Sequence, residues 1–154
     1  MGSGKSSAGK ALAKESEQYF LDTDAMIESA EGKSIERIFK DDGEAYFRRC
    51  EEETVQWLRS SVKNAIISTG GGMLVHCKGL KEVGKIVYLR VPFKTILERM
   101  DASELEKRPL FKDLKTAEQM HEKRDCVYEE KADLIIDAQG TLEETVAKLR
   151  AYIT

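Results

Sequence analysis

Short runs of apolar, β-prone residues recur along the chain and alternate with segments of helical pattern. The apolar runs occupy residues 19–21, 65–67, 86–91 and 134–136. The helical segments occupy residues 6–14, 34–39, 43–60, 93–100, 116–130 and 141–152. Continuous apolar runs between helices are typical of parallel strands that are covered on both faces. The pattern therefore predicts an α/β fold in three layers, with a parallel sheet between two layers of helices.

Local start signals support two of these helices. Ser34 follows Gly32 at the start of one helix, and Thr141 with Glu144 matches a capping box at the start of another. Trp57 lies in the helical segment 43–60, and we expect its side chain in the core. Because the chain shows no internal repeat, low-complexity tract or linker, its 154 residues are predicted to form a single domain.

Composition narrows the class of protein. Hydrophobic residues make up 41% of the chain and charged residues 34%, which is typical of a globular protein and argues against disorder. The net charge is -3 with both signs interspersed, so we expect no nucleic-acid partner. No apolar run is long enough to span a membrane, and the three cysteines lack metal-ligand spacing. We expect a cytoplasmic monomer with reduced thiols.

The first residues match the second half of the phosphate-loop pattern GxxxxGK[ST]. The matching residues are Gly2, Ser3, Gly4, Lys5 and Ser6. Glycines in this pattern let backbone N–H groups surround phosphate oxygens at the start of a helix. Lys5 is expected to reach the β- and γ-phosphates of ATP, and the Ser6 hydroxyl to ligate Mg²⁺.

Two features of this segment depart from the full pattern. Its first glycine is absent, and no strand precedes the loop in this sequence. In this topology the strand before the loop lies in the middle of the sheet, so we expect that the sequence is trimmed at its N-terminus. Met-Gly-Ser-Gly as the remnant of an expression tag is the alternative. The amphipathic pattern that continues through residues 7–14 favours the phosphate loop.

Two carboxylates follow the first apolar run. Asp22 and Asp24 come directly after residues 19–21, at the carboxyl end of a predicted strand, where open α/β sheets bind ligands. Strand alternation places both side chains on the same side, so one can serve Mg²⁺ and the other an acceptor hydroxyl. A turn or a helix cap is the alternative for this pair.

Further candidates follow in the next two elements. Arg48 and Glu51 lie three residues apart on one helix face, where a weak surface pair is the default interpretation. Gly70, Gly71 and Gly72 follow the run 65–67 and expose backbone N–H groups for close approach by a ligand. An ordinary flexible loop is the alternative for the glycines.

Together, six segments resemble the shikimate kinase family of small P-loop kinases. In chain order they are GSGKS at 2–6, FLDTD at 20–24, Phe47-Arg48 followed by Glu51, STGGG at 68–72, KRPL at 107–110, and Arg124 with Tyr128. The resemblance implies strand order 2-3-1-4-5, with the first strand missing from this sequence. It also implies ATP-dependent phosphorylation of the 3-hydroxyl of shikimate, on the pathway to chorismate and aromatic amino acids.

The resemblance further implies a shikimate-binding segment at about residues 24–51, with further contacts from later residues. Its shikimate-binding residues would be Asp24, Arg48, Gly70, Gly71, Gly72 and Arg124. Glu51 would hold Arg48 in place, and Phe39 with Phe47 would form an apolar wall.

On the nucleotide side, the resemblance implies that Ser3 to Ser7 and Gly2 bind ATP and that Asp22, through water, supports Mg²⁺ with Ser6. Arg108 would stabilise phosphate charge from a mobile lid at about 101–114. Arg99 would lie against adenine, which the loop 137–141 would border. Lys5, Asp24 and Arg108 would be the catalytic groups, with Asp24 either a base or an orienting group.

Other functions remain as alternatives at this point. A different P-loop kinase, of the gluconate kinase or nucleoside monophosphate kinase type, would share GSGKS but need other acceptor contacts. A nucleotide-binding module without turnover would bind ATP alone, and a purely structural protein would bind no nucleotide. The combination of Asp24, Arg48 and Arg124 with the glycines favours a carboxylated polyol as the acceptor.

Overall fold

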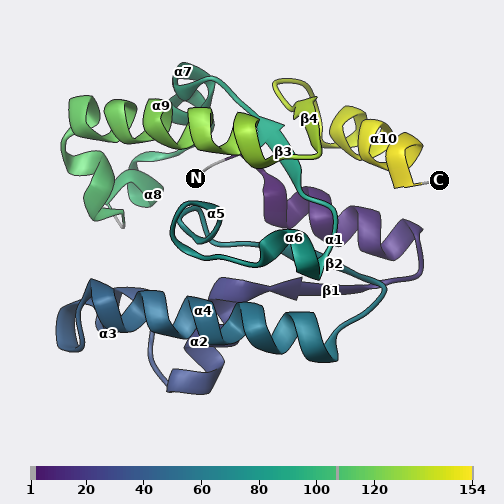
Figure 1. The fold of residues 1–154 in the computed structure, drawn as a ribbon. Helices are drawn as coiled ribbons and strands as arrows, with labels where there is room; N and C mark the ends of the chain where they lie inside the picture. Colours follow the sequence, from purple (N-terminus) through teal and green to yellow (C-terminus); the bar gives the residue numbers. More distant parts are fainter. Residues whose placement is uncertain (1–2, 107, 154) are drawn as a thin grey trace.

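The computed structural model describes residues 3–106 and 108–153, in which short strands alternate with helices (Figure 1). The strands are β1 Tyr19–Asp22, β2 Ala65–Ser68, β3 Val87–Arg90 and β4 Leu134–Asp137. Each strand begins and ends within one residue of a predicted apolar run. The four predicted strands are confirmed.

The six predicted helices are also present, with bounds that differ by at most two residues. They are α1 Lys5–Glu15, α3 Ile35–Asp41, α4 Glu44–Ser61, α7 Phe93–Arg99, α9 Leu114–Lys131 and α10 Leu142–Ile153. The elements that the pattern did not predict are α2 Thr23–Glu31, α5 Met73–His76, α6 Leu80–Val83, α8 Ala102–Glu106 and the 3-10 helix η1 Pro109–Lys112. Most of these are four or five residues long, which is too short for a helical period to show.

The predicted helix starts form the expected hydrogen bonds. Ser34 accepts a bond at 3.2 Å from the N–H of Arg37. In the capping box, the N–H of Thr141 donates to the Glu144 carboxylate at 2.9 Å, and the N–H of Glu144 donates to the Thr141 hydroxyl at 3.2 Å. Both predictions from local sequence are therefore confirmed.

The strands form two parallel pairs. β1 pairs with β2 from Tyr19 opposite Ala65 to Asp22 opposite Ser68, and β3 pairs with β4 in the same way. Among the described residues, β2 and β3 are not paired with each other. The strand order implied by the family resemblance places one further strand between β2 and β3. Within the part of the chain that the structure describes, the facing edges of these two strands carry backbone groups without ladder partners.

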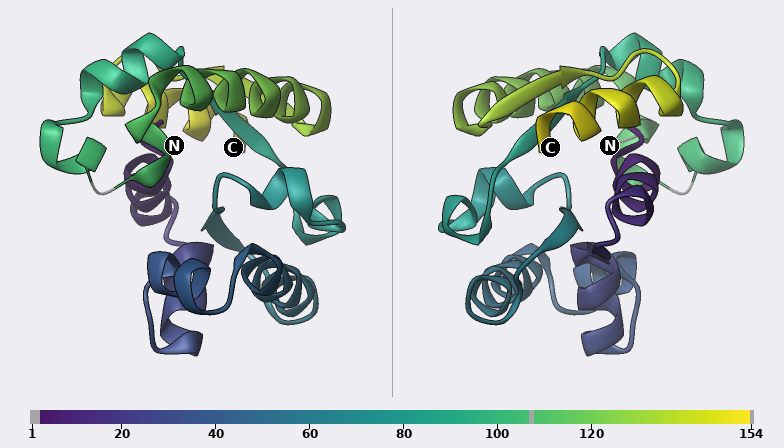
Figure 2. Two further views of the ribbon diagram at one scale, coloured as in Figure 1. Left: turned by 90° about the vertical axis from the view of Figure 1, so that its left-hand side faces the viewer. Right: turned by 90° about the vertical axis from the view of Figure 1, so that its right-hand side faces the viewer.

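A cavity of about 830 Å³ lies between β2 and β3. Apolar side chains from both strands line it, among them Ile66 and Leu89, together with Leu12 of α1 and Leu149 of α10. Figure 2 shows the two halves of the molecule on either side of this region, joined by α1 on one side and by α5 and α6 on the other. The cavity also reaches Ser3 and the glycine loop, so it connects the split in the sheet with the ligand-binding edge.

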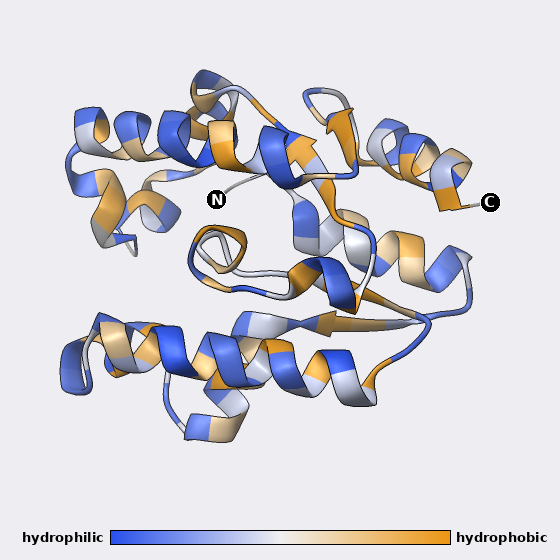
Figure 3. Ribbon diagram, in the orientation of Figure 1, coloured by the Kyte–Doolittle hydropathy of each residue, from blue (hydrophilic) through white to orange (hydrophobic). Residues whose placement is uncertain are grey.

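The core is divided among three clusters of buried side chains. The largest packs α1, α7 and α10 against β3 and β4, the second joins α2, α3 and α4, and the third joins α4 to α5 and α6. Figure 3 shows apolar strands and helices of mixed polarity, as expected for helices that cover a sheet. The prediction for Trp57 is wrong, because α4 buries the stripe of Glu51, Val55 and Leu58 and leaves Trp57 49% exposed.

Candidate active site

The phosphate loop leads directly into α1. Gly4 has φ 77°, in the left-handed region that favours glycine, and its carbonyl accepts a bond at 2.9 Å from the N–H of Ala8. Lys5 is the first residue of α1, Ser6 is half-buried, and Ser7 is exposed on the first turn. Gly2 lies outside the described residues. The first turn of α1 therefore offers the geometry in which helix N-termini bind anions.

Lys5 interacts with four charged side chains from three different parts of the chain. Burial lowers the pKa of the Lys5 amine, and the carboxylates of Asp24 and then Asp22 move that pKa part of the way back. Arg108 and Arg124 lower the same pKa further. The Lys5 amine thus interacts electrostatically both with the acidic pair and with the two arginines that the family resemblance assigns to the lid and the acceptor site.

Asp22 links the two halves of the site. Its carboxylate accepts bonds from the Ser6 hydroxyl at 2.9 Å and from the N–H of Asp24 at 3.0 Å, so it also caps α2. The Ser6 hydroxyl lies 3.1 Å from that of Ser68, at the end of β2. Asp22 therefore caps α2, which was the alternative interpretation, and it also contacts the phosphate loop.

Asp24 lies in the first turn of α2, because β1 ends at Asp22. Both carboxylates interact electrostatically with Lys5. The prediction that strand alternation places them on one side is wrong, because Asp22 ends β1 and Asp24 lies in the first turn of α2. Burial raises the pKa of the Asp24 carboxyl, and Lys5 moves it part of the way down. Within the described residues, Oδ1 of Asp24 is buried without a hydrogen-bond partner, which leaves it available to a ligand hydroxyl.

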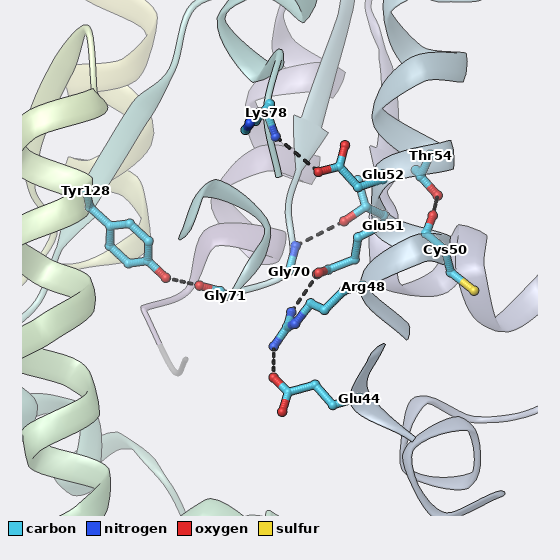
Figure 4. Close-up of polar contacts among 11 residues, drawn as sticks. Glu44, Arg48, Cys50, Glu51, Glu52, Thr54, Gly70, Gly71, Lys78 and Tyr128 are labelled. Carbon is cyan, nitrogen blue, oxygen red and sulfur yellow. Dashed lines mark hydrogen bonds and ion pairs between the residues drawn. The ribbon is translucent and has the colours of Figure 1, made fainter. Parts of the chain in front are cut away.

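Arg48 and Glu51 form a pair in which Glu51 is buried and Arg48 is half-buried, which contradicts the default interpretation of a surface pair. Nη1 of Arg48 donates to Glu51 at 2.6 Å, and Glu51 is 1% exposed; Nη2 reaches Glu44 at 3.2 Å (Figure 4). Burial raises the pKa of the Glu51 carboxyl, and the bond from Arg48 moves it part of the way back. Glu51 therefore holds the Arg48 guanidinium at the site.

Three successive glycines bring the acceptor residues together. A methyl group at Gly70 would lie 2.6 Å from Oδ1 of Asp24, and one at Gly72 would lie 2.5 Å from Nη1 of Arg48. At Gly71 the nearest atom would be Nη1 of Arg124, at 3.0 Å. A side chain at these positions would displace the Asp24 carboxylate or the arginine guanidinium groups from the loop, so the glycines have a packing role that an ordinary flexible loop would not require.

The predicted aromatic wall is partly in the core. Phe47 is buried with Ile27 and Ile38, and Phe39 is 38% exposed beside it, with the ring centroids 4.8 Å apart. The guanidinium carbon of Arg48 lies 5.3 Å from the centroid of the Phe47 ring. The two rings therefore adjoin the Arg48 side of the site.

The segment 101–114, which is predicted to form the lid, contains α8 and η1, with Arg108 exposed directly before η1. Lys107 of the same motif lies outside the described residues.

Nη2 of Arg99 donates to the carbonyls of Ala138, Gln139 and Gly140 at 2.8–3.1 Å. Arg99 and the loop 137–141, which the sequence assigned separately to the nucleotide base, are thus joined to each other.

Several polar residues at the site had no predicted role. The buried hydroxyl of Thr23 accepts a bond at 3.0 Å from the N–H of Gly70, and Ser68 contacts Ser6. Tyr128 donates to the carbonyl of Gly71, and Lys131 donates to the carbonyl of Leu74 at 3.0 Å. Thr23 follows β1 and Ser68 ends β2. Their position at the carboxyl ends of parallel strands, where open α/β sheets bind ligands, is the sequence feature that indicates a place in the site.

The fold and the site define a class of protein. A glycine-containing loop that opens α1, with one carboxylate at the end of β1 and another in the first turn of α2, is typical of a P-loop kinase for small molecules. The site geometry by itself leaves the acceptor to be identified.

Comparison with known proteins identifies the family. The family model described as shikimate kinase matches residues 1–154. Proteins named shikimate kinase from Helicobacter hepaticus and Clostridium botulinum strain Okra are 40% and 42% identical, over 97% of this chain and 89% and 90% of theirs. The chain belongs to the shikimate kinase family.

Solved structures agree with this assignment. The crystal structure of shikimate kinase from Aquifex aeolicus has a TM-score of 0.82 and 35% identity, covering 99% of this chain and 91% of that one. Shikimate kinase from Acinetobacter baumannii in complex with shikimate has a TM-score of 0.85 and 31% identity, covering 99% and 88%. The P-loop α/β fold predicted from the sequence is therefore confirmed.

Proposed function

We propose that this chain transfers the γ-phosphoryl group of ATP to the 3-hydroxyl of shikimate, giving shikimate 3-phosphate and ADP. The observation that carries the proposal is the meeting of Asp24, Arg48 and Arg124 at the glycine loop, near Lys5. Shikimate has one carboxylate for the guanidinium groups and ring hydroxyls for Asp24. A planar guanidinium binds a carboxylate through two parallel bonds, which suits this substrate.

On the nucleotide side, backbone N–H groups from Ser3 to Ser7 and the amine of Lys5 would hold the phosphates at the start of α1. Arg99 lies with the loop 137–141 and would border the adenine there. The partly buried surroundings of Lys5 strengthen its attraction to phosphate oxygens, because water screens the charge less there than at an exposed site.

Ser6 and Asp22 fit a magnesium ion that is shared with ATP. Their oxygens are 2.9 Å apart, and Mg²⁺ in kinases is usually held by few protein oxygens together with substrate phosphates and water. Among residues 3–106 and 108–153, no group of three His, Cys, Asp or Glu side chains could hold a metal alone, and this arrangement does not need one. When bound, Mg²⁺ would neutralise phosphate charge.

The residues divide the chemistry between orientation and charge. Asp24 would accept a hydrogen bond from the attacking hydroxyl and aim it at the γ-phosphorus. In a loose transition state this hydroxyl needs little prior deprotonation, so positioning supplies much of the rate. Arg108 would add positive charge from the lid beside Lys5 as negative charge shifts toward the leaving oxygen.

The proposal includes a cytoplasmic monomer. Cys50 and Cys77 are buried and Cys126 is exposed, and all three are free, which suits a reducing compartment. No helix in the described part of the chain is long and apolar enough to cross a membrane. Size-exclusion chromatography with light scattering tests the oligomeric state directly.

The reaction is tested by ADP release in a coupled assay with ATP, Mg²⁺ and shikimate. Gluconate and a nucleoside monophosphate serve as control acceptors, and mass spectrometry verifies the N-terminus of the protein used. Release that depends on shikimate supports the proposal. Release only with a control acceptor, or ATP binding without turnover, would replace it with another kinase or a binding module.

Arg124→Ala should raise the KM for shikimate by about 30-fold and leave the KM for ATP within about twofold, because it removes a charge-assisted bond to the carboxylate. Steady-state kinetics with each substrate varied measure both constants. Arg59→Ala is the control, since Arg59 of α4 forms an exposed pair with Glu82 of α6. An unchanged KM for shikimate in Arg124→Ala contradicts the assignment.

Arg108→Ala should lower kcat by about 10²-fold with little change in the KM for shikimate, because one preorganised charge near the phosphates is lost. The control is Lys112→Ala, which removes an exposed charge from the adjacent η1. A normal turnover number in Arg108→Ala would exclude its role on the phosphates.

A further inference from the structure

One face of α9 is tied to the segment that follows β2. Arg124, Tyr128 and Lys131 are spaced by four and three residues, so they lie on the same side of the helix. The Tyr128 hydroxyl donates to the carbonyl of Gly71, as Figure 4 shows, and the Lys131 amine donates to the carbonyl of Leu74. Both bonds join residues that are 57 positions apart in the chain.

The Tyr128 bond is made at the point where Arg124 reaches the glycine loop. A methyl group at Gly71 would lie 3.0 Å from Nη1 of Arg124 and 3.8 Å from the Tyr128 hydroxyl. The same peptide is therefore flanked by the arginine assigned to the substrate and by the tyrosine one helical turn further along α9.

Tyr128 is itself supported from β3. Its ring packs against that of Tyr88, with the centroids 5.0 Å apart and the planes tilted by 59°. The Tyr88 hydroxyl donates to Asp125, which adjoins Arg124 on α9. Burial raises the pKa of the Tyr128 hydroxyl, which therefore keeps its proton and remains a donor at neutral pH.

We infer that Tyr128 is a positioning residue for the acceptor substrate. Its hydroxyl fixes the carbonyl of Gly71, and this bond keeps the backbone of Gly70 and Gly72 against Asp24 and Arg48 while Arg124 keeps its approach to the loop. Glycine is the most freely rotating residue, so a loop of three glycines needs an outside contact to hold one conformation. The inference rests on the proposed function, since the acceptor is taken to be shikimate.

The test is Tyr128→Phe, which removes the hydroxyl and keeps the ring on Tyr88. We expect the KM for shikimate to rise about three- to tenfold, as for the loss of one hydrogen bond, while kcat and the KM for ATP stay within about twofold. Tyr46→Phe is the matched control, because Tyr46 is also a partly buried tyrosine that donates to one acceptor, Glu31 at 2.8 Å.

A second measurement needs no substrate. Hydrogen exchange of the backbone amides at residues 70–72 should be at least about threefold faster in Tyr128→Phe than in the wild type, and unchanged in Tyr46→Phe. Faster exchange without any turnover of shikimate by the wild type would reject the proposed function but keep the loop contact. Unchanged exchange, or an equal rise of both KM values, overturns the positioning role.

Discussion

Asp24→Asn should lower kcat/KM for shikimate by about 10³-fold, within the range found when a positioned proton acceptor is removed. The amide has nearly the same shape, but it can no longer accept the proton or attract it with a full negative charge. The measurement is the coupled assay at saturating ATP. Asp41→Asn is the control, because Asp41 forms an exposed pair with Arg37. A loss below about fivefold would show that Asp24 neither orients nor deprotonates the acceptor.

The same substitution should make the protein more stable at neutral pH. Burial raises the pKa of Asp24 in the folded protein above the usual 3.8, so the folded state holds its proton more tightly than the unfolded state. This tighter proton binding stabilises the folded state fully below about pH 3.8, and the stabilisation is lost as the pH rises through the folded-state pKa of Asp24. Asp24→Asn avoids this loss, so its melting temperature should exceed that of the wild type at pH 7, by an amount that shrinks as the pH falls.

A lower melting temperature for Asp24→Asn at neutral pH would contradict this account of the carboxylate. The expected combination of low activity and higher stability is typical of a buried charge retained for function. Loss of both together would instead indicate that Asp24 supports the fold.

Much of the molecule follows from local sequence. The apolar runs predict the four described strands because a parallel strand that is covered on both faces must be apolar on both. Leu89 of β3 belongs to the largest buried cluster, and Ile66 of β2 packs against that cluster. The caps at Ser34 and Thr141 depend on atoms within three residues, so a short pattern is sufficient. The candidate residues Asp24, Arg48 and Arg124 were indicated by their family motifs, and the structure brings them together.

The remaining features depend on contacts that no local pattern encodes. The spacing of Glu51 and Arg48 indicated a surface pair, but Glu51 is buried because the face of α4 that carries it is turned toward the glycine loop. Thr23 and Tyr128 fall within the family motifs, but their bonds to glycines 47 and 57 residues away are seen only in the folded chain. Strand alternation was the wrong reason to place Asp22 and Asp24 on one side, because β1 ends at Asp22 and Asp24 lies in the first turn of α2.

The divided sheet leads to the prediction with the largest effect on stability. A segment of five Val and Ile residues, joined to the N-terminus ahead of Met1, should insert between β2 and β3 as a parallel strand. Ser6 contacts Ser68 at the carboxyl end of β2, so a strand that enters the phosphate loop runs in the same direction as β2. The cavity there is lined by apolar side chains, and its two strand edges lack partners among the described residues.

Each buried Val or Ile side chain contributes about 2 kcal/mol, and ordering each residue costs about 1.5 kcal/mol. Five residues therefore leave about 2.5 kcal/mol, and the ladder bonds on both edges add to it. For a chain of this length we expect the melting temperature to rise by about 10 °C, measured by differential scanning calorimetry.

The control is an equally long segment of Gly and Ser, which adds the same length of chain without apolar side chains or strand propensity. Hydrogen exchange should also slow at the amides of β2 and β3 in the Val/Ile variant alone, because those edges become paired. Affinity for ATP should rise in parallel, since the strand would fix the entry of the phosphate loop at Ser3. Equal melting temperatures for the two extended proteins would mean that the space between β2 and β3 does not accept a strand.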